Sequence, residues 1–125
     1  MKLLLDTHAY LWWLSDSGQL ATDARIAIAN PRNFVFVSAA SIIEIAIKQA
    51  NGKLRINVFP EDLMESCRFR ELPLKIVHAA ALRDLPPVHK DPFDRLLVAQ
   101  ARVEDMTLVS RDAVLSGYDV PILAA

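Results

Sequence analysis

"LLLDTHAYLWWL", residues 3–14, is the stretch that decides the fold. Its leucines continue an apolar run from Lys2 without polar alternation, which is typical of a β-strand buried on both faces. Asp6 ends this run, and a helical pattern follows it with no hairpin turn between the two. The stretch therefore predicts a strand over residues 2–5 joined directly to a helix, which is how a unit of a parallel sheet begins.

The same order of elements recurs along the chain. Further strands are expected at FVFVS (34–38), RELPL (70–74), TLVS (107–110) and VPIL (120–123), and helices over residues 7–14, 21–30, 39–52, 61–69, 75–85 and 91–105. No linker, repeat or low-complexity segment interrupts them. The sequence therefore predicts one α/β domain over residues 1–125, a three-layer α/β/α arrangement with a mostly parallel central sheet of four to five strands.

Composition limits the class of protein. The 125 residues are 53% hydrophobic and 23% charged, which is enough to bury the core of one domain. The net charge of -1 gives no strong overall field toward nucleic acid, although a local patch can still attract it. The single cysteine, Cys67, excludes an internal disulfide and suits a reducing compartment. The longest nearly apolar stretch contains Glu44 and is shorter than the roughly 20 residues that span a bilayer, so we expect a soluble, cytoplasmic protein with no membrane partner.

Four acidic residues stand at the junctions between strands and helices. Asp6 ends the first strand, and Asp112 follows the strand over residues 107–110. Glu44 lies in the first two turns of the helix after the second strand, and Asp94 lies in the first turn of the helix over residues 91–105. In an open α/β sheet these junctions share one edge, where ligands bind. We therefore expect the four carboxylates to converge.

Each of these acids also has a local explanation. Asp6 can cap the first helix, and Asp112 can cap the turn that follows it. Glu44 can complete a capping box with Ser41 or pair with Lys48 four residues on. These explanations leave one fact open, because uncharged Ser, Thr or Asn would cap as well, yet all four junctions carry a carboxylate. The joint pattern favours a site.

Asp91 and Asp94 begin the helix over residues 91–105. Asp91 followed by Pro92 is a good N-cap and first helical residue, and Asp94 lies where the helix dipole favours a negative charge. This explanation is sufficient for Asp91 by itself.

Carboxylates that converge need an opposing charge. At about 5 Å and an effective dielectric near 20, each pair repels by roughly 3 kcal/mol. The chain has no cysteine pair or histidine cluster, so an all-oxygen site selects a hard cation, Mg²⁺ or Mn²⁺. The sequence therefore predicts metal-assisted phosphodiester chemistry.

Four segments carry a resemblance to a known family. "LLLDTHAYLWWL", "SAASIIEIAIK", "HKDPFDRLLVAQA" and "LVSRD" resemble, in order and spacing, the PIN domain ribonucleases, and specifically the VapC-type toxins of type II toxin-antitoxin systems. The resemblance implies a single PIN-like nuclease domain over residues 1–125 and a Mg²⁺-dependent endoribonuclease whose activity inhibits growth. It also implies a homodimer, an RNA substrate and a small VapB-type antitoxin, with DNA contacted only through the antitoxin.

The resemblance also assigns roles to residues. By motif, the metal-binding and catalytic acids are Asp6, Glu44, Asp94 and Asp112. The role of Asp91 stays open between a contact to a second metal through water and a helix cap, and Ser110 is expected to orient a metal-bound water. The resemblance implies that water, and not the ribose 2′-hydroxyl, is the nucleophile, leaving a 5′-phosphate and a 3′-hydroxyl.

Residues near these motifs are left with open roles. His8 can face the rim of the site or pack against Trp12, and Trp12 and Trp13 can stack on a base or fill the core or a dimer interface. Candidate phosphate contacts are Lys48, Lys53, Arg55, Lys90, Arg95 and Arg111, each of which can equally be a solvated charge.

Two rival functions start from the same acids. A phosphoryl-transfer hydrolase of the haloacid dehalogenase type places an Asp at the end of its first strand but needs a second Asp two residues later, where this chain has His8. A non-catalytic module would use the acidic edge to bind a basic peptide. Metal-dependent RNA cleavage separates the nuclease from this binding module.

Overall fold

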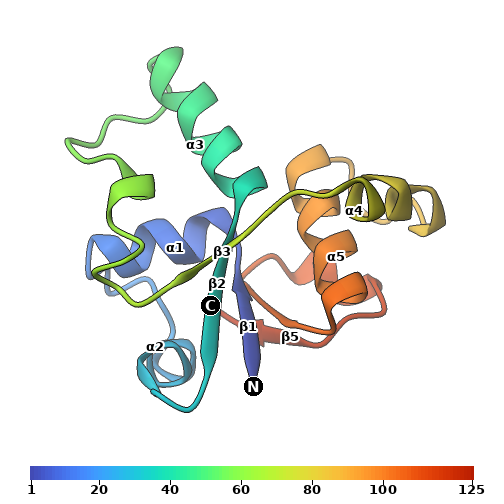
Figure 1. Cartoon of the computed structure of the whole chain (residues 1–125), viewed down its shortest axis with the longest axis horizontal. Helices are drawn as coiled ribbons and strands as arrows, with labels where there is room; N and C mark the ends of the chain where they lie inside the picture. Colours follow the sequence, from blue (N-terminus) through green and yellow to red (C-terminus); the bar gives the residue numbers. More distant parts are fainter.

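A single five-stranded sheet forms the centre of the molecule in this computed structural model, which describes residues 1–125 (Figure 1). The strands are β1 (Lys2–Leu5), β2 (Phe34–Ser38), β3 (Arg70–Leu72), β4 (Thr107–Ser110) and β5 (Ile122–Ala124). Their order is β3-β2-β1-β4-β5, and every neighbouring pair is parallel. The carboxyl ends of all five strands therefore meet at one edge, and the predicted fold class is confirmed.

Helices cover both faces of this sheet. They are α1 (Thr7–Leu14), α2 (Thr22–Ala29), α3 (Ala39–Ala50), α4 (Ile76–Ala81) and α5 (Pro92–Glu104). In Figure 1, α1 and α2 lie on one side of β1 and β2, α4 and α5 lie on the other, and α3 extends beyond the carboxyl end of β2. None of these helices has the length and apolar character needed to cross a membrane.

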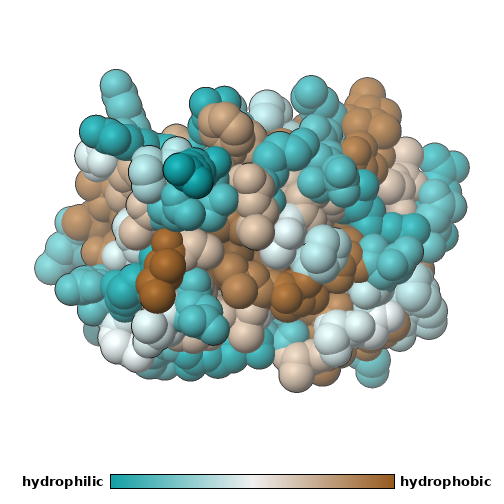
Figure 2. Space-filling view, turned by 90° about the horizontal axis from the view of Figure 1, so that it is seen from below, coloured by the Kyte–Doolittle hydropathy of each residue, from teal (hydrophilic) through white to brown (hydrophobic).

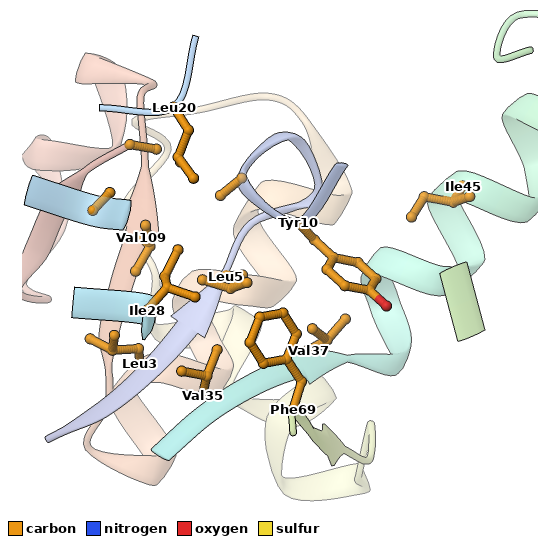
Figure 3. Close-up of a cluster of buried hydrophobic side chains, with 13 residues drawn as sticks. Leu3, Leu5, Tyr10, Leu20, Ile28, Val35, Val37, Ile45, Phe69 and Val109 are labelled. Carbon is orange, nitrogen blue, oxygen red and sulfur yellow. The ribbon is translucent and has the colours of Figure 1, made fainter. Parts of the chain in front are cut away.

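The β1 leucines explain why the first strand shows no polar alternation. Leu3 and Leu5 pack with Tyr10 and Val37 under α1 and α2, as Figure 3 shows for this side of the sheet. Leu4 points to the opposite face and packs in the cluster built largely from α5. Because successive side chains of a strand alternate between faces, a strand with helices on both sides must be apolar throughout.

Two predicted helices differ from the structure. The helix expected over residues 61–69 is wrong, because a 3₁₀ turn at Pro60–Asp62 is followed by a single hydrogen-bonded turn before β3. The amides of Arg68 and Phe69 bond back to the carbonyls of Glu65 and Met64, which closes the segment after a single turn. The helix expected over residues 75–85 is shorter, since α4 ends at Ala81 and continues as a 3₁₀ turn over Leu82–Asp84 before the two prolines.

Candidate active site

A cavity of about 220 Å³ opens at the carboxyl edge of the sheet. Its lining residues come from α1, α3, the start of α5 and the segment after β4: Asp6, Thr7, His8, Trp12, Glu44, Lys48, Asp91, Asp94, Arg111 and Asp112. The five acids singled out in the sequence therefore line one cavity, although they lie up to 106 positions apart along the chain.

Asp6 and Glu44 are held on one side of the cavity. One carboxylate oxygen of Asp6 accepts the backbone N–H of Ala9 at 2.8 Å, so Asp6 caps α1 and also lines the cavity. The two oxygens of Glu44 accept hydrogen bonds from the Thr7 hydroxyl and from Lys48 Nζ, both at 2.7 Å. The pairing with Lys48 is thus present. The alternative capping box with Ser41 is absent, because α3 is capped by the residue before it, Ser38.

His89 joins Asp94 and Asp112 on the other side. Its Nε2 lies 2.7 Å from Oδ2 of Asp112 and 3.3 Å from Oδ2 of Asp94. Its Nδ1 accepts the backbone N–H of Asp91 at 2.9 Å, so in the neutral imidazole the proton is on Nε2. Potential ligand atoms of His89, Asp94 and Asp112 all lie within 4.8 Å of one another, whereas Asp6 and Glu44 are outside this group.

The local explanations for Asp91 and Asp112 also hold. Asp91 Oδ1 accepts the backbone amides of Phe93 and Asp94, at 2.8 and 3.3 Å, and caps α5. Asp112 Oδ1 accepts the amide of Val114 at 3.0 Å. Capping and cavity lining are therefore compatible, since each carboxylate has a second oxygen.

Ser110 lies behind the cavity and does not line it. Its side chain is buried at 2% exposure, and its hydroxyl accepts the backbone N–H of Asp112 at 3.1 Å. A hydrogen bond from the same hydroxyl lowers the pKa of Asp6, against the larger effect of burial. Ser110 therefore links the two strand ends that carry Asp6 and Asp112.

Burial and crowding raise the pKa values of two of the acids. Burial, followed by the charges of Asp91 and Asp6, raises the pKa of Asp94 to about 6. Burial is also the main reason why the pKa of Asp6 is raised. Burial acts upward on Asp112 as well, but hydrogen bonds from His89 and the Val114 amide outweigh it and lower its pKa. Ionising Asp6 and Asp94 together thus costs free energy in the absence of a cation.

The donor set fits a hard divalent cation. Five carboxylates line the cavity, and the only Lys or Arg side chains among the lining residues are Lys48 and Arg111. Lys48 is bound to Glu44, and Arg111 stacks on Trp12, with its guanidinium carbon 4.3 Å from the ring centroid. Carboxylate oxygens are the ligands that Mg²⁺ and Mn²⁺ prefer, and Lys48 and Arg111 leave most of those in the cavity without a paired cation.

The sequence did not reveal the role of His89 or the internal hydrogen bonds of Arg95. His89 lies in the quoted segment HKDPFDRLLVAQA, two residues before Asp91, and that proximity was the available signal. Arg95 was a candidate phosphate contact, but its Nη1 donates to the Pro86 carbonyl at 3.0 Å and to the Tyr118 hydroxyl at 3.1 Å. Of the six basic candidates, only Lys48 and Arg111 line the cavity.

The two tryptophans occupy different places. Trp12 lines the cavity with its ring centroid 5.7 Å from that of His8. His8 and Trp12 also line a neighbouring cavity of about 510 Å³, whose other walls are mostly apolar and include Leu11 and Leu54. Trp13 packs against Phe69, with ring centroids 5.9 Å apart, and does not line the acidic cavity.

Comparison with solved structures finds the same fold in toxin-antitoxin complexes. The chain is similar to a chain of VapBC2 from Rickettsia felis bound to a promoter DNA fragment, with a TM-score of 0.72 at 13% identity over 98% of both chains. It is similar to a chain of a toxin-antitoxin complex from Klebsiella pneumoniae (TM-score 0.65, 14% identity) and to one of FitAcB from Neisseria gonorrhoeae (0.62, 19%), each over 98% of this chain and 96% of the other.

Comparison of the sequence itself gives the family. Curated protein sequences give no significant match. The family model described as "PIN domain" matches residues 3–121, which include all five acids of the cavity and end just before β5. With this match over nearly the whole length, the chain belongs to the PIN domain family.

Proposed function

We propose that this chain is a metal-dependent endoribonuclease of the VapC type, the toxin of a type II toxin-antitoxin pair, and that residues 1–125 act as a single nuclease domain. The observation that carries the proposal is the cavity itself, in which five carboxylates from four segments of a PIN domain lie together. The carboxylates of such a cavity repel one another unless a cation or a basic partner binds there.

The proposed metal ligands are Asp6, Glu44, Asp94 and Asp112, with Mg²⁺ as the cofactor and Mn²⁺ as a substitute. When bound, the metal lowers the pKa of a bound water and neutralises charge that develops on the phosphate. In this proposal Asp91 caps α5 and is not a metal ligand, a role that its hydrogen bonds to the Phe93 and Asp94 amides support.

Polar residues in the cavity and next to it orient these acids. Thr7 and Lys48 each bind one oxygen of Glu44, which fixes the plane of that carboxylate. Nδ1 of His89 accepts the Asp91 amide, so the ring proton is on Nε2, and Nε2 donates it to Asp112. Such hydrogen bonds hold ligands in one rotamer and spare the cost of ordering them when a metal binds.

RNA is supported as the substrate by the groups at the rim. Lys48 and Arg111 supply positive charge beside the carboxylates, where phosphate oxygens would approach. Trp12 supplies an aromatic surface beside Arg111, and both kinds of side chain stack on unpaired bases. Water as the attacking nucleophile would leave a 5′-phosphate and a 3′-hydroxyl.

An antitoxin of the VapB type is the proposed partner. His8 and Trp12 line both the acidic cavity and the mostly apolar cavity beside it. One extended segment of the antitoxin can therefore place apolar side chains in the apolar cavity and a basic side chain among the acids. On this proposal DNA is contacted only through the antitoxin. Ile43 and Ile47, about half-exposed and one turn apart on α3, suit a homodimer interface in the cytoplasm.

Expression in a bacterial host tests the toxin proposal. The wild-type chain should arrest growth, whereas Asp6→Asn should not, because the variant lacks one proposed metal ligand. Asp16→Asn is the matched control: Asp16 is exposed, its backbone has a positive φ that Asn also tolerates, and growth should still stop. A folded, well-expressed wild-type chain that leaves growth unaffected would contradict the toxin role, as would arrest by the Asp6→Asn chain.

A further inference from the structure

A second cavity, of about 390 Å³, lies at the opposite edge of the sheet from the acids. It is formed by the carboxyl end of α2, the start of β2 and the turn before β3. Figure 2 views the molecule from the end where β1 and β2 begin, and polar and apolar side chains alternate over that surface. The lining includes Trp13, Asn30, Phe34, Arg68, Phe69 and Arg70. None of the catalytic candidates contributes to it.

The charged side chains of this cavity are positive, whereas those of the acidic site are mostly negative. Two arginines line it and no carboxylate does, in a chain whose net charge is -1. Arg68 forms no ion pair or side-chain hydrogen bond within the protein, and Arg70 only stacks on Phe34, 4.4 Å from the ring centroid. Both guanidinium groups therefore keep their N–H donors available for an anion.

The backbone at Arg68 is unusual for its residue type. Arg68 has φ +61°, and the amides of Arg68 and Phe69 bond to the carbonyls of Glu65 and Met64. This is a Schellman closure, and glycine is the usual residue at the position that Arg68 occupies. The other non-glycine residues with positive φ are Asp16 and Asp105, of a type that tolerates this conformation. An arginine in a conformation where glycine costs least is a backbone outlier, and such outliers are concentrated at ligand-binding sites.

The remaining walls suit a flat, apolar ring. Trp13 and Phe69 lie with ring centroids 5.9 Å apart and form an aromatic wall. Asn30 adds a side-chain amide whose oxygen accepts the Arg32 N–H at 3.0 Å and whose NH₂ group has no partner in the protein. The volume lies within the range of about 300–1,000 Å³ that is typical of small-ligand pockets.

We propose that this cavity binds a nucleoside 5′-monophosphate unit, with the phosphate on Arg68 and Arg70 and the base against Trp13 and Phe69. The shared chemistry belongs either to a free nucleotide or to one nucleotide of a single-stranded RNA. The proposal stands apart from the nuclease proposal, because it involves neither the acids nor a metal. Its test is a binding measurement in EDTA, whose outcome does not depend on whether the chain cleaves RNA.

Titration with 5′-AMP, followed by calorimetry and by amide and indole NMR shifts, provides that test. We expect binding with shifts at Trp13 and Arg68, and at least tenfold weaker binding of adenosine and of inorganic phosphate, because each lacks half of the contacts. Arg68→Gly should raise the Kd for 5′-AMP at least tenfold. The same variant relieves the positive φ, so it should fold as well as the wild type or better, which separates lost binding from lost structure.

Two further arms complete the experiment. Arg70→Gln should also weaken 5′-AMP binding, whereas Arg102→Gln, on the exposed side of α5, should not. A single-stranded RNA oligonucleotide that shifts the same resonances and competes with 5′-AMP identifies the RNA strand as the source, and shifts by 5′-AMP alone identify a free nucleotide. Absence of 5′-AMP binding at 10 mM, or a Kd unchanged in both Arg68→Gly and Arg70→Gln, would overturn the proposal.

Discussion

Nε2 of His89 donates a hydrogen bond to Oδ2 of Asp112 across 2.7 Å. The direction of this bond follows from the other side of the ring, where Nδ1 accepts the Asp91 amide at 2.9 Å. A histidine from the loop before α5 thus fixes a carboxylate that follows β4. The bond orients one proposed metal ligand and bridges two segments that the sheet alone does not tie together.

Removal of this histidine should weaken metal binding. His89→Ala leaves the Asp112 carboxylate held only by the Val114 amide, so we expect the Kd of the variant for Mg²⁺ to rise about 10- to 100-fold, as is typical when a residue that orients a metal ligand is lost. His89→Gln can still place an N–H near the position of Nε2 and should retain part of the affinity. Calorimetric titration at pH 7.5 measures both. Identical Kd values for wild type and His89→Ala would mean that His89 does not position the site.

The raised pKa of Asp94 predicts a stability that depends on pH. In EDTA the folded chain protonates Asp94 with a pKa of about 6, and the ordinary value is 3.8. Because the folded state holds this proton more tightly, the free energy of unfolding falls as pH rises from about 4 through about 6, and it stays lower above that range. Discounted for partial exposure, the loss at pH 8 is about 1–2 kcal/mol.

Denaturant unfolding of Asp94→Asn in EDTA measures this effect. The variant should match wild type near pH 4, apart from a few tenths of a kcal/mol for the charge lost from the first turn of α5. It should be more stable than wild type by about 1–2 kcal/mol near pH 8. A variant that is less stable by the same margin at both pH values would show that Asp94 only serves the helix terminus.

Arg95 should matter for stability more than for RNA. Its Nη1 bonds to the Pro86 carbonyl and the Tyr118 hydroxyl, and that hydroxyl also accepts the His89 amide at 2.9 Å. A lysine ammonium cannot reproduce the planar set of N–H donors of the guanidinium group, so Arg95→Lys should lower the free energy of unfolding by about 1–2 kcal/mol. Arg102→Lys, exposed on the same helix, is the control and should change it little. An Arg95→Lys chain as stable as wild type would contradict this role.

The sheet and most of the helices could be predicted because their signals are local. The run of Leu3, Leu4 and Leu5 predicts a strand buried on both faces. Asp91 followed by Pro92 predicts the start of α5, and in the structure Asp91 caps that helix. The helix predicted over residues 61–69 does not form, and the signal that ends this segment is not visible in the sequence. Its end depends on a left-handed residue at Arg68, where sequence offers no glycine to signal a stop.

The convergence of the acids on one cavity could be predicted from the sequence, whereas the residues that form hydrogen bonds to them could not. Asp6 and Asp112 stand at strand ends, and the parallel topology brings such ends together whatever the details of packing. The backbone amide of His89 binds the hydroxyl of Tyr118, which lies 29 residues away along the chain. The proximity of His89 to Asp91 was the available signal in the sequence, but no periodicity encodes a contact of that kind, so the bond from His89 to Asp112 became visible only in the structure.

The central claim is that the acidic cavity cleaves RNA with a divalent metal, and cleavage of a single-stranded RNA by purified protein tests it most directly. With Mg²⁺ or Mn²⁺ we expect cleavage by the wild-type chain and by Asp16→Asn, no cleavage in EDTA, and a loss of at least two to three orders of magnitude in Asp6→Asn and in Asp94→Asn, comparable to losing a major electrostatic group in the transition state. Cleavage that survives EDTA, or equal rates in wild type, Asp6→Asn and Asp94→Asn, would contradict the account.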